Sequence, residues 1–262
     1  MSRSAGYDRH ISVFSPEGRL FQVGKRLICC EHTPQFNTIA FLLEYALKAA
    51  KSAGLTAVGS RGKDAVCVAI QKKVAEKLMD ASYVTSVHKI TKRIGCVTTG
   101  IAPDGAALVQ RARQIAAEFA DKNGYEIPVH FLSQKLADME QVYTQHAYMR
   151  PYAVNAILFA VDDERGPQLF KVDPAGHFSG YSAVASGPKE QEAFNSLERR
   201  KNFGEATEEE TIHTALATLQ TVCGGGFKAR DVEVALADKN GVFRKLSDEE
   251  VEEVLTAIAE KD

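Results

Sequence analysis

Residues 55–74 read LTAVGSRGKDAVCVAIQKKV, which divides into two apolar runs around the polar turn at 61–64. Short runs rich in β-branched residues on either side of a glycine-containing turn are typical of a β-hairpin. A second pair of short runs follows at about 86–90 and 95–98, around Thr91-Lys92-Arg93. This part of the chain therefore predicts four consecutive strands that pair through tight turns.

The apolar spacing then changes to that of helices. Pro103-Asp104 opens a predicted helix that runs to about Asn123, where Gly124 provides a left-handed stop. A second amphipathic helix is predicted from about Pro128 to Tyr143. The remaining predictions are strands at 152–161, 167–172 and 178–185, helices at 188–201 and 207–222, strands at 232–237 and 242–246, and a last helix from Ser247.

This order of elements predicts the fold class. Hairpins and paired helices occur in separate blocks, which favours antiparallel sheets between helix layers over a parallel sheet with alternating strands and helices. No low-complexity linker or internal repeat divides the chain. Residues 1–262 are therefore expected to form a single α+β domain.

The composition is that of an ordinary globular protein. Apolar residues make up 45% and charged residues 25% of the 262 residues, which argues against a disordered, collagen-like or membrane-embedded chain. The formal charge of -2 argues against a dedicated nucleic-acid binder, which would be clearly basic. The five cysteines lack a C-x-x-C pair, and the first residues carry no apolar signal segment. Together these features predict reduced thiols and an intracellular location.

Clusters of chemically active side chains are weak in this sequence. Cys29-Cys30-Glu31-His32 collects groups able to bind a metal, but a structural zinc site needs a second ligand pair at a defined spacing. Gly224-Gly225-Gly226 follows a predicted helix instead of preceding one, unlike a phosphate-binding loop. The acidic runs after Thr207 and Ser247 fit helix-capping boxes better than catalytic carboxylates. The residues alone predict no catalytic group, no metal and no cofactor, and favour an assembly component or a binding protein.

A family resemblance adds what the residues alone do not give. Residues 6–23 read GYDRHISVFSPEGRLFQV and closely resemble the opening of 20S proteasome alpha subunits. Residues 125–129 and 141–145 look most like the alpha type-6 class, also called alpha-1. Further matches cover nearly the whole chain in the family's order: Glu44-Tyr45-Ala46, Gln71-Lys72-Lys73-Val74, Tyr143-Thr144-Gln145, Arg150-Pro151 and Asp173-Pro174-Ala175-Gly176.

The resemblance implies a four-layer αββα sandwich of the N-terminal-nucleophile hydrolase type, in agreement with the predicted element order. It also implies a non-catalytic chain, because the catalytic beta members attack with an N-terminal threonine whose own amine is the base, whereas this sequence begins Met1-Ser2-Arg3. Such chains occupy one position of a seven-membered alpha ring with other alpha subunits, beta subunits and a regulatory particle or activators. They support ubiquitin-dependent protein degradation in the cytoplasm and nucleus. An independent N-terminal-nucleophile hydrolase and a stand-alone binding module stay open as alternatives.

By resemblance, the N-terminal tail carries the gating residues. Tyr7, Asp8 and Arg9 match the motif that holds neighbouring tails in the open or closed gate, and Pro16 matches the turn at its base. Contacts of a phenol with proline and aspartate are weak singly and cooperative in a ring. Many alpha subunits also have a lysine that receives the C-terminal carboxylate of an activator. Ser86 occupies the matching position here, which leaves Lys89 or the neighbouring chain of the ring to supply that charge.

Residues 24–43 have no counterpart in the family and interrupt what should be one helix between Val23 and Glu44. Pro34 cannot continue a helix, whereas the residues from Thr38 onward could rebuild its first turns and displace the tail from the gate. The segment is either a structured, lineage-specific loop or a translated intron. We favour the intron, because residues 24–25 can be encoded by GGTAAG, residues 43–44 permit an acceptor-like AG, and loss of the segment restores the family motif.

Overall fold

The computed structural model describes residues 13–14, 20–21, 35–52, 54–74, 76, 78–145, 149–200, 203–224 and 228–260, with side chains from Leu43 onward. The helices and strands are, in chain order, β1 (Val13–Phe14), β2 (Leu20–Phe21), α1 (Gln35–Ser52), β3 (Ala57–Arg61), β4 (Val66–Gln71), η2 (Ala81–Tyr83), β5 (Val87–Lys89), β6 (Gly95–Gly100), α2 (Ala102–Asn123), α3 (Val129–Gln145), β7 (Val154–Asp162), β8 (Gly166–Val172), β9 (Phe178–Gly180), β10 (Ala183–Ser186), α4 (Glu190–Glu198), η3 (Phe203–Glu205), α5 (Glu208–Cys223), η4 (Ala229–Asp231), β11 (Val232–Ala237), β12 (Phe243–Lys245) and α6 (Asp248–Ala259).

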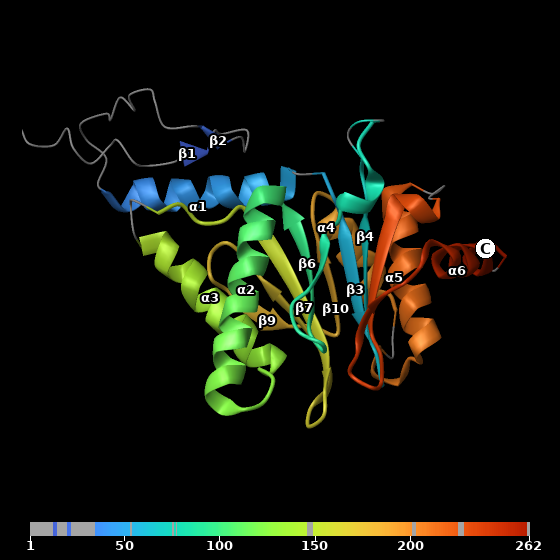
Figure 1. The fold of residues 1–262 in the computed structure, drawn as a ribbon. Coiled ribbons are helices and arrows are strands. Elements are labelled where there is room, and N and C mark those ends of the chain that lie inside the picture. Colours follow the sequence, from blue (N-terminus) through green and yellow to red (C-terminus); the bar gives the residue numbers. More distant parts are fainter. Residues whose placement is uncertain are drawn as a thin grey trace, which may run out of the picture.

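Four layers make up the body of the molecule (Figure 1). One five-stranded sheet has the order β10-β3-β4-β11-β12, and the other has the order β5-β6-β7-β8-β9. Helices α2 and α3 cover the second sheet, while α4, α5 and α6 cover the first. All strand pairs in these two sheets are antiparallel. This arrangement confirms the predicted α+β fold with helix layers outside two antiparallel sheets.

The first predicted hairpin is β3–β4. Ala57 faces Ile70 and Arg61 faces Val66, and the turn closes with a hydrogen bond of 2.8 Å from the Gly62 nitrogen to the Ala65 carbonyl oxygen. Both strands are buried along nearly their whole length because layers lie on both sides of the sheet. The second hairpin, β5–β6, forms where it was predicted.

Local signals set the helix ends. Helix α2 has Pro103 in its first turn and ends at Gly124, whose φ of 78° is in the left-handed region. Thr207 and Ser247 each accept a hydrogen bond from the backbone three residues ahead and complete the predicted capping boxes of α5 and α6.

The predicted strand at 178–185 is wrong as a single element. The structure divides it into β9 and β10, which belong to different sheets. At the crossover, the Tyr181 nitrogen donates to the Leu169 carbonyl oxygen at 2.8 Å, while the Arg61 nitrogen donates to the Ser182 carbonyl oxygen at 2.9 Å. The backbone of this segment thus forms hydrogen bonds first with one sheet and then with the other. The alternation of apolar residues in the sequence does not reveal this change of sheet.

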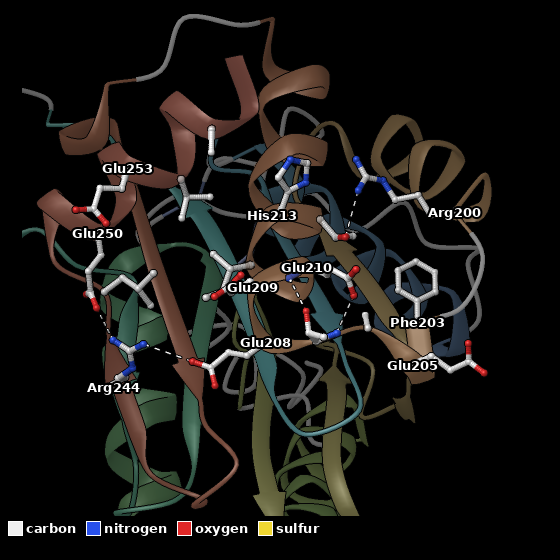
Figure 2. Close-up of a pocket in the computed structure, with 17 residues that line it drawn as sticks. Arg200, Phe203, Glu205, Glu208, Glu209, Glu210, His213, Arg244, Glu250 and Glu253 are labelled. Atoms are coloured by element: carbon white, nitrogen blue, oxygen red, sulfur yellow. Dashed lines mark hydrogen bonds and ion pairs between the residues drawn. The ribbon is translucent and has the colours of Figure 1, made fainter. Parts of the chain in front are cut away.

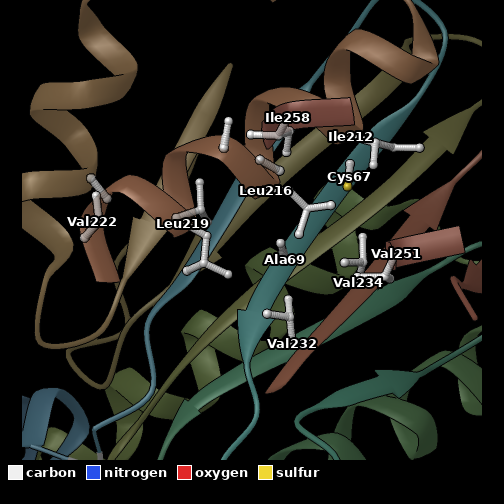
Figure 3. Packing of buried hydrophobic residues seen from close by; sticks show 14 of the residues in the cluster. Cys67, Ala69, Ile212, Leu216, Leu219, Val222, Val232, Val234, Val251 and Ile258 are labelled. Atoms are coloured by element: carbon white, nitrogen blue, oxygen red, sulfur yellow. The ribbon is translucent and has the colours of Figure 1, made fainter. Parts of the chain in front are cut away.

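Apolar residues fill all three spaces between the layers. Figure 3 shows the cluster between the first sheet and its helices, in which Leu216 and Leu219 of α5 pack over Cys67 and Ala69 of β4. The two sheets meet through a second cluster that includes the fully buried Phe159. Burial of this extent is the main stabilising contribution to the sandwich.

Helix α1 lies across one end of the sandwich (Figure 1). Ala46 and Ala49 in its second half pack on Ala153, and Lys51 in its last turn lies 3.6 Å from a carboxylate oxygen of Glu190 in α4. Strand β1 pairs with β2 and lies against α1. The predicted helix after Thr38 therefore exists, and it begins earlier, at Gln35.

Candidate functional site

The predicted gate residues Tyr7, Asp8, Arg9 and Pro16 lie outside the described residues. The same holds for Cys29-Cys30-Glu31-His32. The roles assigned to these residues by resemblance therefore stay predictions.

Ser86 lies at a polar junction between the two sheets. Its backbone nitrogen donates to Glu233 Oε2 at 3.0 Å, and the Thr85 hydroxyl donates to the same oxygen at 3.1 Å. Lys72 Nζ lies 3.6 Å from the other oxygen of Glu233, and Lys245 Nζ donates to Thr85 Oγ1 at 2.6 Å. Two lysines from β12 and the end of β4 therefore lie beside the position at which a lysine was expected.

Burial sets the electrostatics of this junction. It lowers the pKa of Lys245, an effect that Glu233 opposes and Lys72 reinforces. Burial likewise lowers the pKa of the His88 imidazole, and the charge of Lys245 adds to this effect. Sequence reasoning missed Lys72 and Lys245 as neighbours of Ser86 because neither is near it in the chain. Only the pairing of β11 with β4 and β12 brings them together.

The connection between β4 and β5 exposes apolar side chains. Leu78 is 99% exposed and Tyr83 is 85% exposed, and Val74 and Met79 are also exposed. The segment projects from the same end of the molecule as α1 (Figure 1). Large apolar side chains that project together from a surface are characteristic of protein–protein contact sites.

A cavity of about 1280 Å³ lies between the start of α5, helix α6, η3 and β12 (Figure 2). Its walls carry six glutamates, and Glu208, Glu210 and Glu250 have local partners. Glu210 closes the capping box of α5, and Arg244 contacts Glu250 at 2.7 Å and Glu208 at 3.5 Å. The glutamates at 208–210 and 250 lie in the first turns of α5 and α6, as the sequence predicted.

Two hydroxyl groups in the interior are hydrogen-bonded to each other. Thr99 and Ser186 share a hydrogen bond of 2.6 Å in the interior, and both side chains are fully buried. Burial raises the pKa of the Cys67 and Cys96 thiols, which keeps them protonated. In the described part of the chain, no three His, Cys, Asp or Glu side chains are grouped to hold a metal. Nor does any helix that the structure describes have the length and apolarity to cross a membrane.

A buried charge cluster lies beneath α1. Asp104 at the start of α2 accepts two hydrogen bonds from Arg150 and one of 3.0 Å from the Ala153 nitrogen. Glu140 of α3 is 2% exposed, and the Tyr152 nitrogen donates to its Oε2 at 3.4 Å. Burial raises the pKa of Glu140 to about 8. The cluster joins α2, α3 and β7 at the end of the sandwich that carries α1, so it positions the surface on which α1 lies.

Comparison with known proteins gives two family matches. Residues 51–237 match the family described as "Proteasome subunit", and residues 7–23 match the N-terminal signature of A-type proteasome subunits. The signature match ends at Val23, immediately before the segment 24–43. Residues 24–50 belong to neither match.

Full-length relatives agree with these matches. The chain is 46% identical to a probable proteasome alpha type-1 subunit of Schizosaccharomyces pombe and 41% identical to the proteasome alpha type-6 subunit of Caenorhabditis elegans, in both cases over 100% of each chain. It is 35% identical to the proteasome alpha subunit of Methanopyrus kandleri, over 96% of this chain and 93% of the relative. The chain belongs to the proteasome alpha-subunit family.

Proposed function

We propose that the chain is a non-catalytic structural and gating subunit of the 20S proteasome alpha ring. The observation that carries this proposal is the pair of family matches, with an alpha signature at 7–23 and the broader proteasome match at 51–237. Full-length identity to alpha subunits supports the same role. We place the gating contacts at Tyr7, Asp8, Arg9 and Pro16, which lie within this signature.

A physical argument supports the absence of catalysis. An N-terminal nucleophile needs a free amine beside its hydroxyl group. We consider Thr56 because it immediately precedes β3, the first strand in chain order of the two five-stranded sheets. Its nitrogen is a peptide nitrogen that donates to Gln71 Oε1 at 3.2 Å. Helix α1 precedes it, so this nitrogen cannot act as a base. We therefore assign any proteolysis to partner beta subunits.

The exposed segment 74–83 is proposed as a contact with a neighbouring chain of the ring. Leu78 and Tyr83 are too exposed to stabilise the single chain, and covering them would remove apolar surface from water. Other alpha subunits, beta subunits and a regulatory particle or activator are the proposed partners. The proposed location is the cytoplasm and nucleus, where such particles support ubiquitin-dependent degradation.

Ser86 has no positive charge with which to bind the C-terminal carboxylate of an activator. Lys245 and Lys72 already contact Thr85 and Glu233, so an activator carboxylate must compete with these groups. We therefore propose that this position binds activators more weakly than one with a free lysine.

The chain is proposed to form one domain, and residues 24–43 are proposed to be absent from the mature protein. Neither family match includes this segment, which agrees with residues that are foreign to the family. Mass spectrometry of the native protein tests the proposal. A peptide that joins Val23 directly to Glu44 is expected, and abundant peptides from within residues 26–48 would contradict it.

Native mass measurement of the protein purified from cells tests the ring proposal. We expect a mass many times that of one chain, with co-purifying alpha and beta subunits. A solitary chain would support a stand-alone binding module. Peptide hydrolysis by the isolated chain would support an independent hydrolase. Either result would overturn the proposed function.

The proposed contact segment has its own test. Leu78→Asp and Tyr83→Asp are expected to lower incorporation into the ring about tenfold, the effect of losing a contact worth about 1.4 kcal/mol. Val242→Asp is the matched control, because Val242 is also an exposed apolar residue but lies in the β11–β12 turn. Equal incorporation of all three variants would exclude segment 74–83 from the interface.

A further inference from the structure

One carboxylate oxygen of Glu140 in α3 is buried without a hydrogen-bond partner among the described residues. This atom is Oε1, while Oε2 accepts a long hydrogen bond of 3.4 Å from the Tyr152 nitrogen. A carboxyl group in such a place is stable in its neutral form, because ionisation would leave a buried charge without water or strong donors.

The arginine of this cluster is engaged with the other carboxylate. Arg150 donates to both oxygens of Asp104 at 2.6 Å, and its Nη1 also donates to the Pro151 carbonyl oxygen at 3.3 Å. Asp104 accepts a further hydrogen bond from the Ala153 nitrogen. An ionised Glu140 would therefore place a second buried carboxylate beside a single arginine that already has a partner.

The other titratable groups around Glu140 do not supply a positive charge. Among the described residues, Asp173 at the β8–β9 turn is a third acid, and its charge also opposes ionisation of Glu140. Tyr152 and Tyr143 pack edge to face with ring centroids 5.5 Å apart. Burial raises the pKa of the Tyr152 phenol, so this group is neutral near pH 7.

Helix α1 lies over this end of the sandwich and contacts α3, β6 and β7 (Figure 1). Its buried apolar cluster consists of Ala46, Ala49 and Ala153, whereas the other three clusters contain many larger side chains. Alanines bury little apolar surface, so residues 44–52 should separate from the sandwich at a lower cost than the sheets. The printed sequence places the charged side chains of this part of α1 in two pairs, Glu44 with Lys48 and Lys51 with Glu190.

The two carboxylates hold the backbone on which α1 rests. Glu140 accepts from the Tyr152 nitrogen and Asp104 accepts from the next nitrogen along the chain, that of Ala153. Ala153 is also the residue on which the alanines of α1 pack. A change of charge at Glu140 therefore acts directly beneath the helix.

We propose that the proton on Glu140 controls the opening of α1. While the carboxyl group is neutral, residues 44–52 stay packed on Ala153. When it releases its proton to water, the new carboxylate needs hydration, and separation of α1 from Ala153 admits that water. The proposal concerns residues 44–52 and therefore does not depend on residues 24–43.

The direction of the pH effect follows from the two states. In the closed state burial raises the pKa of Glu140 to about 8, whereas in the open state the hydrated carboxyl returns toward its ordinary value of 4.5. Between these values the closed state holds a proton that the open state has lost. Each rise of one pH unit should therefore make opening about tenfold more frequent.

Hydrogen exchange in the purified full chain tests the proposal. The amides of residues 46–52 are followed at pH 5.5, 6.5 and 7.5, with each rate corrected for intrinsic exchange. We expect their protection factor to fall about tenfold for each pH unit. Glu140→Gln is neutral at every pH and should keep a constant protection factor. Glu118→Gln is the matched control, because Glu118 is an exposed acid of α2 that Gln114 contacts at 3.0 Å, and it should behave as the unaltered chain.

The amides of β4 distinguish a local opening of α1 from unfolding of the whole chain. Low concentrations of urea should lower the protection of β4 and leave that of residues 46–52 unchanged. A protection factor of α1 that is constant with pH in the unaltered chain would refute the proposal, as would exchange of α1 that follows β4 in urea. Equal pH slopes in the unaltered chain and Glu140→Gln would refute it as well.

The first two of these outcomes need only the unaltered chain, so they decide the matter even where a variant does not fold. All of the readouts concern a single chain. Their failure would therefore leave the ring proposal intact, and a solitary chain in the native mass measurement would leave the role of Glu140 intact.

Discussion

Arg150 donates two parallel hydrogen bonds of 2.6 Å to Asp104, one to each carboxylate oxygen. The Asp104 residue is only 4% exposed, and hydrogen bonding to it raises the pKa of the Arg150 guanidinium. This pair ties the start of α2 to the chain just before β7. Because the carboxylate is buried, its partner cannot be replaced by water.

Arg150→Ala is expected to lower the unfolding free energy by about 3 kcal/mol, because it leaves the buried Asp104 carboxylate without its cation. Arg93→Ala is the matched control. Arg93 pairs with Asp163 on the surface, and screening by solvent limits that pair to less than about 1 kcal/mol. Urea denaturation of both variants measures the difference. Equal losses of unfolding free energy in the two variants would show that burial of the Arg150–Asp104 pair does not add to stability.

Gly100 is expected to tolerate no side chain. Its φ is 140°, and a Cβ atom there would lie 2.3 Å from the Ala153 carbonyl oxygen. Gly124 also has positive φ, at 78°, but has open space around it. Gly124→Ala is therefore expected to cost about 1 kcal/mol, and Gly100→Ala considerably more. Thermal unfolding of the two variants checks this order, and a Gly100→Ala variant as stable as Gly124→Ala would contradict it.

Glu190 links α1 to the sandwich. Its carboxylate pairs with Lys171 of β8, and Lys51 Nζ of α1 lies 3.6 Å from one of its oxygens. The side chains of Glu190 and Lys171 are largely buried, whereas that of Lys51 is exposed. Glu190→Gln is expected to destabilise the chain by about 2 kcal/mol and to speed proteolysis within α1, since Lys171 loses its buried partner.

Glu44→Gln is the control for that variant. It removes only the exposed pair between Glu44 and Lys48 within α1, which is 2.8 Å long. Exposed pairs of this kind contribute little to stability, so its unfolding free energy should match that of the unaltered chain. If both variants speed proteolysis equally, the link through Glu190 is not what holds α1.

Sequence patterns predicted the parts of the fold that depend on local chemistry. The turn around Gly62, the stop at Gly124 and the capping boxes of Thr207 and Ser247 each depend on a few neighbouring residues, and all four are confirmed. The order of the predicted strands and helices then predicted the sandwich.

The missed features depend on residues far apart in the chain. The change of sheet between β9 and β10 is fixed by backbone hydrogen bonds to Leu169 and Arg61, which no pattern at 178–185 encodes. Lys245 reaches Thr85 only because β12 pairs with β11. The predicted gate residues depend on neighbouring chains, so a single chain cannot test them.

Glu140 is expected to give the stability of the protein a distinctive pH dependence. Burial raises the pKa of this carboxyl to about 8, and the negative charge of Asp104 adds to the effect. The folded state therefore holds a proton that the unfolded state releases near pH 4.5. The resulting stability is fully present below the unfolded pKa and is lost as pH rises through the folded pKa.

Between about pH 5.5 and 7.5, this one group should lower the unfolding free energy by about 1.4 kcal/mol for each pH unit. Glu140→Gln keeps a neutral side chain at every pH, so its slope should be smaller by that amount. The difference between the two slopes cancels the other titrating groups, which both proteins share. Parallel slopes across this range would mean that Glu140 is ionised in the folded protein, and that the cluster beneath α1 holds two carboxylates against one arginine.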